Sequence, residues 1–88
     1  MTELSETIEL MQSEDFKERF KAEYWQTKIR HDKLAEMLKK YKAGTLAFEP
    51  KSSEALLTWQ MLVMKKYLFA LEERARIEEI DLNGGRTQ

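Results

Sequence analysis

The sequence predicts an all-α fold: a long antiparallel two-helix hairpin with a short N-terminal helix, which assembles as a homo-oligomer. Three glycines and one proline in 88 residues are too few for the turns of an all-β fold. Charged residues make up 35% of the chain, a composition that suits long helices. The length allows one domain, residues 1–88, with a small core that favours self-association.

Helix start and stop signals divide the first half of the chain. A short helix is expected over residues 1–12, on the apolar spacing of Leu4, Ile8 and Met11. A long helix is predicted over 13–43, with Ser13 as its N-cap and Gly44 as its stop. Alternating steps of four and three define its seam, the residues that face a partner helix: Phe20, Tyr24, Thr27, His31, Leu34, Leu38 and Tyr41.

The second half continues the hairpin. A connector over 44–51 is short enough to make the flanking helices antiparallel neighbours. A second helix is predicted over 52–82, with Ser52 or Ser53 as its cap, and a flexible tail over 83–88 follows. The apolar stripe expected to face the first helix consists of Leu57, Met61, Met64, Leu68, Leu71 and Ala75.

The second helix carries more apolar surface than one partner helix can cover. The additional stripes consist of Leu56, Val63, Tyr67, Ala70 and Ile77, and of Trp59, Leu62, Phe69 and Ile80. A helix that is apolar nearly all round belongs in a buried environment. Self-association would provide it, with an oligomer interface predicted at Trp59, Leu62, Val63 and Phe69. The alternative is that the N-terminal segment folds over these stripes within one chain.

Several function classes are disfavoured by what the sequence lacks. The chain has no cysteine, and it shows no Gly-rich phosphate loop, no His-rich metal motif and no nucleophile beside its single histidine. We therefore expect no catalytic residue, no cofactor and no metal, and hence no enzyme. The acidic N-terminus and the absence of a long uncharged apolar run predict a cytoplasmic protein without a membrane partner.

Positive charge is concentrated in the middle of the chain. Residues 19–66 contain eleven Lys and Arg against five Asp and Glu, whereas the net charge of the whole chain is −1. If residue i of the first helix faces residue 95 − i of the second, cations and aromatic rings meet at one level. They suit a ligand with phosphates and bases, although a solvated face would carry similar charges. The candidate ligand-binding residues are Tyr24, Trp25, Lys28, Arg30, Lys65, Lys66 and Tyr67, with His31 nearby.

The segments DFKERFKAEYWQTKIRHDKL and LLTWQMLVMKKYLFALEERARIEEIDL resemble a group of small bacteriophage proteins. Those proteins have an EY-x-x-x-K-x-R-x-x-KL first helix and a Q-x-x-x-M-x-x-Y-x-x-x-LE-x-R second helix. They are similar in turn to the helical-hairpin superfamily of phage immune-evasion proteins that includes the anti-CBASS and anti-Thoeris sponges. The resemblance covers residues 15–82.

This resemblance implies a homo-oligomer, commonly a hexamer, that acts in the cytoplasm of a bacterial host cell. Its ligand would be a cyclic oligonucleotide or a cyclic ADP-ribose-type signal, captured without chemistry. Lys28 matches the phosphate-binding lysine of that superfamily and Arg30 the polar residue two positions later. The stacking tyrosine of the superfamily lies further upstream than Tyr24, which leaves Phe16 as an alternative stacker.

Three functions remain open from the sequence, one of which is a plain helical assembly factor with no ligand. The first is a non-enzymatic phage immune-evasion protein that sequesters cyclic nucleotide signals of anti-phage defence. The alternative is a phage helical interaction protein that binds and inhibits a host defence protein through the same apolar and basic surface. A nucleic-acid polymer is not expected as a partner, because the acidic flanks would repel its phosphates.

Overall fold

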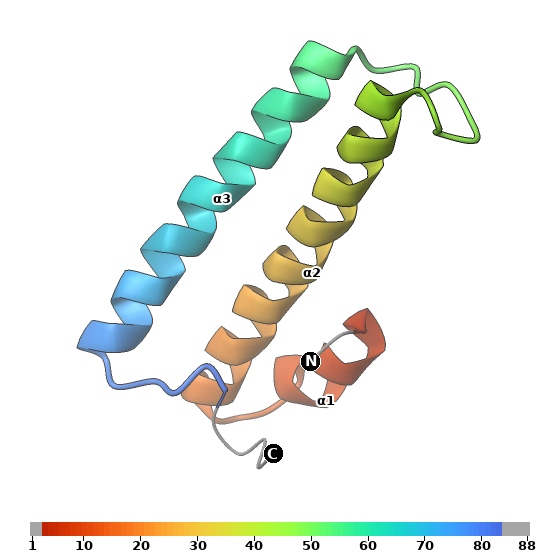
Figure 1. Ribbon diagram of the computed structural model, residues 1–88. Coiled ribbons are helices and arrows are strands. Elements are labelled where there is room, and N and C mark those ends of the chain that lie inside the picture. Colours follow the sequence, from red (N-terminus) through yellow and green to blue (C-terminus); the bar gives the residue numbers. More distant parts are fainter. Residues whose placement is uncertain (1–2, 84–88) are drawn as a thin grey trace.

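The computed structural model describes residues 3–83, and over that range the chain is helical without strands (Figure 1). A 3₁₀ turn, η1 (Leu4–Thr7), leads into α1 (Ile8–Met11), followed by α2 (Phe16–Ala43) and α3 (Glu54–Ile77). The helices α2 and α3 lie side by side and run in opposite directions, and α1 lies beside the first half of α2. The predicted all-α class is therefore confirmed for the described residues.

Local capping explains where α2 begins and ends. Asp15 is the N-cap, and its Oδ1 accepts a hydrogen bond from the Lys17 amide at 3.0 Å. The predicted cap, Ser13, instead accepts from the Asp15 amide at 3.0 Å and shapes the turn before the helix. At the other end, Gly44 has a φ of 74°, the left-handed conformation that favours glycine after a helix. The predicted stop at Gly44 is confirmed.

The second long helix starts as predicted and ends earlier than predicted. Ser53 is its N-cap, and its hydroxyl accepts from the Leu56 amide at 3.1 Å. The helix stops at Ile77, before the predicted end at residue 82, because Glu79 turns the chain with a φ of 58°. The amide of Ile80 then donates to the Ala75 carbonyl at 2.8 Å, which is the Schellman arrangement, and the Ile80 side chain is buried.

The core lies at the end of the hairpin where α2 begins and α3 ends. Both helices and the turn after α3 contribute to it: Phe20, Tyr24, Leu68, Leu71, Ala75 and Ile80 are buried together. Leu82 and Trp25 pack against this cluster, and Trp25 Nε1 donates to the Leu82 carbonyl at 2.9 Å. The segment after α3 therefore crosses back to α2 and closes this end of the hairpin.

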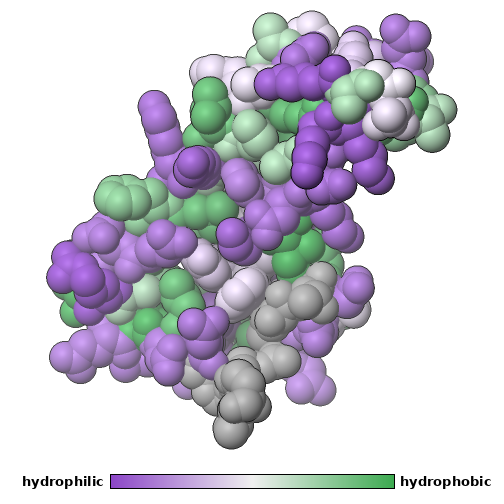
Figure 2. Space-filling view, in the orientation of Figure 1, coloured by the Kyte–Doolittle hydropathy of each residue, from purple (hydrophilic) through white to green (hydrophobic). Residues whose placement is uncertain are grey.

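The N-terminal segment packs on α2 and makes no packing contact with α3. Thr7 is 1% exposed, and its hydroxyl donates to the Leu4 carbonyl at 2.7 Å and accepts from Gln26 Nε2 at 2.9 Å. The alternative in which this segment covers the extra stripes of α3 is therefore wrong. Hydrophobic residues reach the surface along the α3 side of the molecule (Figure 2). They include Leu56, Trp59, Leu62, Val63, Tyr67, Phe69 and Ile77.

We expect the folded state to depend on Leu71, which is 2% exposed at the centre of the core. Replacing Leu71 with Ala removes buried methyl groups and leaves a cavity, so the free energy of unfolding should fall by about 2–5 kcal/mol. Urea unfolding followed by circular dichroism measures this loss. Gln60→Ala, at an exposed position of the same helix, is the matched control and should change stability by less than about 0.5 kcal/mol.

Candidate functional site

The predicted cations share one level of the hairpin but point in different directions. Tyr24 donates its hydroxyl hydrogen to Glu72 Oε2 at 2.9 Å, which fixes the register between α2 and α3 close to the predicted one. Each residue turns a helix by about 100°. Lys28 and Arg30, two residues apart, therefore project from nearly opposite sides of α2. Lys65, Lys66 and Tyr67 follow one another on α3 and fan out around it.

One side of the hairpin brings cations and an aromatic ring together. On α2, Lys21 and Lys28 flank Tyr24 at helical spacing, and on α3, Lys65 lies seven residues before Glu72. The Tyr24–Glu72 hydrogen bond therefore places the three lysines on the same side of the molecule. Phe69, four residues after Lys65 and 64% exposed, also lies there. We call this surface the basic–aromatic face: Lys21, Lys28, Lys65 and Phe69.

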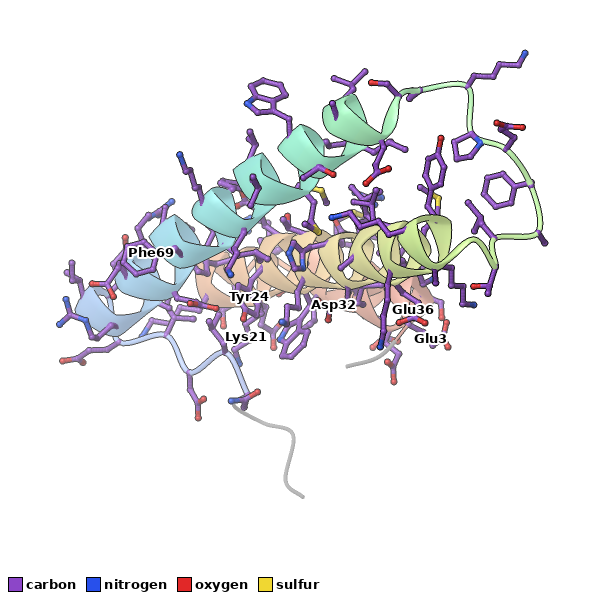
Figure 3. The ribbon with its side chains drawn as sticks, turned by 45° about the horizontal axis from the view of Figure 1, so that its top comes forward. Glu3, Lys21, Tyr24, Asp32, Glu36 and Phe69 are labelled. Carbon is purple, nitrogen blue, oxygen red and sulfur yellow. The ribbon has the colours of Figure 1, made fainter. Side chains whose placement is uncertain are left out.

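Figure 3 shows this side of the molecule, with Tyr24, Lys21 and Asp32 on α2 and Phe69 on α3. Phe69 was predicted at an oligomer interface, and its place beside Lys65 was overlooked. The i, i+4 spacing of Lys65 and Phe69 was the available signal. An exposed phenyl ring next to ammonium groups can stack on a base while the ammonium groups contact phosphate oxygens.

Lys28 forms an exposed ion pair with the carboxylate of Asp32. Its Nζ lies 3.5 Å from Asp32 Oδ1, and the two side chains are 38% and 55% exposed. The same Asp32 oxygen lies 3.0 Å from His31 Nδ1. An exposed pair of this kind contributes little to stability, so a more strongly charged anion can take the place of Asp32. His31 is half-buried at the seam and holds Asp32, rather than facing a ligand.

Two predicted ligand-binding aromatics are engaged in internal contacts. Tyr24 is 7% exposed, and its ring meets that of Trp25 edge-on at 5.2 Å. Burial, followed by the hydrogen bond to Glu72, raises the pKa of Tyr24 to about 12. Trp25 is fixed by its hydrogen bond to the Leu82 carbonyl. Both rings therefore organise the fold beneath the basic–aromatic face, and the buried ring of Tyr24 presents no free face for stacking.

The remaining predicted residues lie on other sides. Arg30 is exposed on the opposite side of α2 from Lys28, and Tyr67, 43% exposed, lies on the corresponding side of α3. Lys66 projects from the outer side of α3, away from α2, together with Trp59 and Val63. The structure does not bring these residues together with Lys28 and Lys65.

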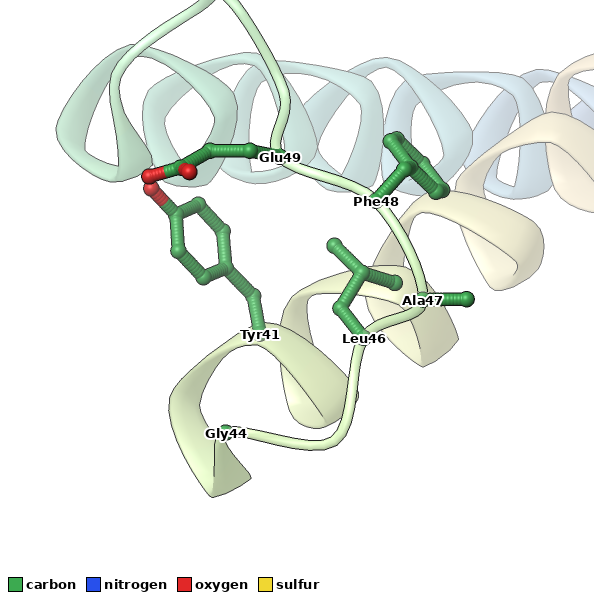
Figure 4. Close-up of a pocket in the computed structure, with 6 residues that line it drawn as sticks. All are labelled: Tyr41, Gly44, Leu46, Ala47, Phe48 and Glu49. Atoms are coloured by element: carbon green, nitrogen blue, oxygen red, sulfur yellow. The ribbon is translucent and has the colours of Figure 1, made fainter.

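The connector forms a hollow of about 390 Å³, shown in Figure 4. The ring of Tyr41 points across it toward Glu49. Its lining includes one carboxylate and no cation: Tyr41, Gly44, Leu46, Ala47, Phe48 and Glu49. This lining disfavours an anion. A second hollow, near the start of α3, is lined by Glu54, Ala55, Thr58, Trp59 and Leu62.

Within residues 3–83, no group of three or more His, Asp or Glu side chains is placed to hold a metal ion. None of the helices in this range is long and apolar enough to cross a bilayer. The fold and its surfaces define a small α-helical hairpin protein with one basic–aromatic side and an exposed apolar side.

The family model for Sequestin matches residues 14–77, which include α2, the connector and α3. The chain therefore belongs to the Sequestin family. Comparison with curated proteins and with solved structures finds no match.

The buried hydroxyl of Tyr24 predicts a pH dependence of stability. The folded state holds this proton more tightly than the unfolded chain, whose tyrosines ionise near the ordinary pKa of 10. The stabilisation is therefore complete below pH 10 and is lost as the pH rises toward 12. Urea unfolding at a series of pH values should show this decline in the wild type, and a shallower one in Tyr24→Phe. Identical slopes would contradict the role assigned to the Tyr24–Glu72 bond.

Proposed function

We propose that this protein sequesters a small phosphate-bearing signalling molecule, a cyclic oligonucleotide or a cyclic ADP-ribose-type compound, without changing it chemically. The observation that carries the proposal is the match to Sequestin, a family name that denotes sequestering. The matched residues 14–77 include the whole basic–aromatic face. A search for the ligand should therefore start from anions that also contain a base.

The basic–aromatic face supports the ligand class by its chemistry. Lys28 and Lys65 supply ammonium groups from two different helices, so a phosphate between them meets charge from both sides. Phe69 lies within one turn of Lys65 and offers a ring for a base. Asp32 leaves Lys28 when the phosphate arrives, which keeps the cost of binding low because the pair is exposed.

A protein that captures its ligand without changing it chemically must be abundant and must bind that ligand tightly. Each bound molecule occupies one site, so sequestration is effective only when the protein is abundant and holds its ligand more tightly than the intended receptor does. Small size and self-assembly suit these demands, since every 88-residue chain contributes a site. We place this activity in the bacterial cytoplasm, as an evasion of anti-phage defence by a homo-oligomer.

A second candidate function is inhibition of a host defence protein by direct binding. The exposed apolar surface of α3, with Trp59 at 63% and Ile77 at 69% exposure, favours it, because such surfaces mark interaction sites. Under this function the small-molecule panel described below gives no response, and the apolar surface rather than Lys28 determines activity.

Thermal shift with cyclic dinucleotides, cyclic trinucleotides and cyclic ADP-ribose isomers tests the proposed ligand class. A ligand that binds only the folded state raises the melting temperature. Lys28→Ala and Lys65→Ala should each weaken binding by about tenfold or more, because each removes a charge-assisted contact to phosphate. Lys33→Ala, an exposed lysine on another side of α2, is the control and should bind like the wild type. No shift with any compound would contradict the proposal.

The stacking role of Phe69 is tested separately by Phe69→Ala. Loss of a base–ring contact should weaken binding by about 1–3 kcal/mol and should leave the salt dependence of binding unchanged. Isothermal titration at two salt concentrations measures both. Phe48→Ala removes an equally exposed ring from the connector, 59% against 64%, and should have no effect on affinity. Equal losses in the two variants would remove Phe69 from the site.

A further inference from the structure

We propose that two copies of this chain pair through the outer face of α3, with the two α3 helices antiparallel. The outer face is defined by one stripe of residues that point away from the core: Leu56, Trp59, Val63, Lys66, Tyr67, Ala70 and Ile77. No other described segment packs on this stripe, because α2 contacts the opposite side of α3 and α1 contacts only α2 and η1. The inference rests on the self-assembly in the proposed function and is independent of its ligand.

The spacing of the stripe is that of a helix-pairing seam. Leu56, Val63, Ala70 and Ile77 follow one another at intervals of seven residues, the repeat that keeps a line of side chains facing a partner helix. A globular helix needs only one such seam, and α3 already uses Leu68, Leu71 and Ala75 against α2. The second seam is therefore free for another helix. A second copy carries the same seam, so a two-fold axis makes the surface complementary to itself.

Charge decides the direction of pairing. In a parallel pair, Lys66 and Glu73 would each lie level with the same residue of the second copy, and like charges would repel. In an antiparallel pair with the two-fold axis level with Leu68, Lys66 lies near Glu73 of the second copy. Within one chain these residues are two turns apart and cannot meet. Glu73 already accepts a hydrogen bond from Arg76 through Oε1, which leaves its second oxygen for Lys66.

The same register also packs the apolar residues. Trp59 lies level with Ile77 of the second copy, so the two large side chains with 63% and 69% exposure cover each other. Lys66 lies level with the small Ala70 of the second copy, which leaves room for the lysine stem beside the helix. Trp59 therefore packs against Ile77, and the long side chain of Lys66 lies opposite the small Ala70, as interdigitating helices require.

This pairing divides the predicted site residues into two sets. Lys66, Trp59 and Tyr67 belong to the assembly surface, whereas Lys28 and Lys65 remain open to a ligand. Lys65 is turned by about 100° from Lys66 around α3, so its side chain points away from the second copy.

Sedimentation equilibrium of the full chain tests the pairing. The wild type should dimerise or form a multiple of dimers at micromolar concentration, and Val63→Glu should be monomeric. Lys66→Glu should weaken association by at least about tenfold, because it faces Glu73 of the second copy. Adding Glu73→Lys to Lys66→Glu should restore wild-type association by exchanging the two charges. Circular dichroism should show the same helix content in all variants, since every altered side chain is at least partly exposed.

A monomeric wild type would overturn the inference and leave the apolar face to a different protein. Association that persists in Val63→Glu would overturn it as well, and so would failure of the charge exchange to restore association. Lys28→Ala distinguishes failure of the pairing from failure of ligand binding, because this variant should lose ligand binding and keep wild-type association. A variant that loses association on replacement of Lys28 would contradict the division into two faces.

Discussion

A two-helix hairpin has one interface between its helices, and the rest of this structure follows from that constraint. The side of α3 that carries Leu68, Leu71 and Ala75 packs against α2. A single partner helix cannot cover the other sides of α3. The N-terminal segment braces α2 through Thr7 and does not reach α3. The apolar outer face of α3 is consequently exposed. The lysines Lys21, Lys28 and Lys65 lie on a different side of the hairpin, on the basic–aromatic face. The proposed assembly surface and the proposed ligand site thus lie on different sides of the hairpin.

Elements with local signals could be predicted from the sequence. Gly44 and Ser53 bound the connector as expected, because the backbone conformation at a cap is determined by the residue that occupies it. The early end of α3 had no such signal, since the turn is made by Glu79 rather than by glycine. The burial of Ile80 against the core stabilises that turn, and this contact depends on α2. Tertiary packing therefore overrode the helical pattern that continues to Leu82.

The predicted register of the two helices was nearly correct, but the sequence did not establish the direction of each candidate side chain. Axial level follows from the register of the helices, which the connector fixes, whereas direction follows from the rotation of each helix about its axis. This rotation separates Lys28 from Arg30 and Lys65 from Lys66. It also turns Tyr24 inward to Glu72, a contact between residues 48 positions apart in sequence. The assignment of roles to Lys28, Lys65 and Phe69 remains a proposal.

Under the proposed function, the position of Asp32 determines what a ligand must displace at Lys28. Its carboxylate lies 3.5 Å from the Lys28 ammonium group, so binding is an exchange of one anion for another rather than the filling of a bare positive site. Any ligand competes with a carboxylate that is tethered nearby at high effective concentration. Singly charged metabolites, although abundant, gain little from that exchange. A molecule with two or more phosphates that also reaches Lys65 would gain more from that exchange than a singly charged metabolite would.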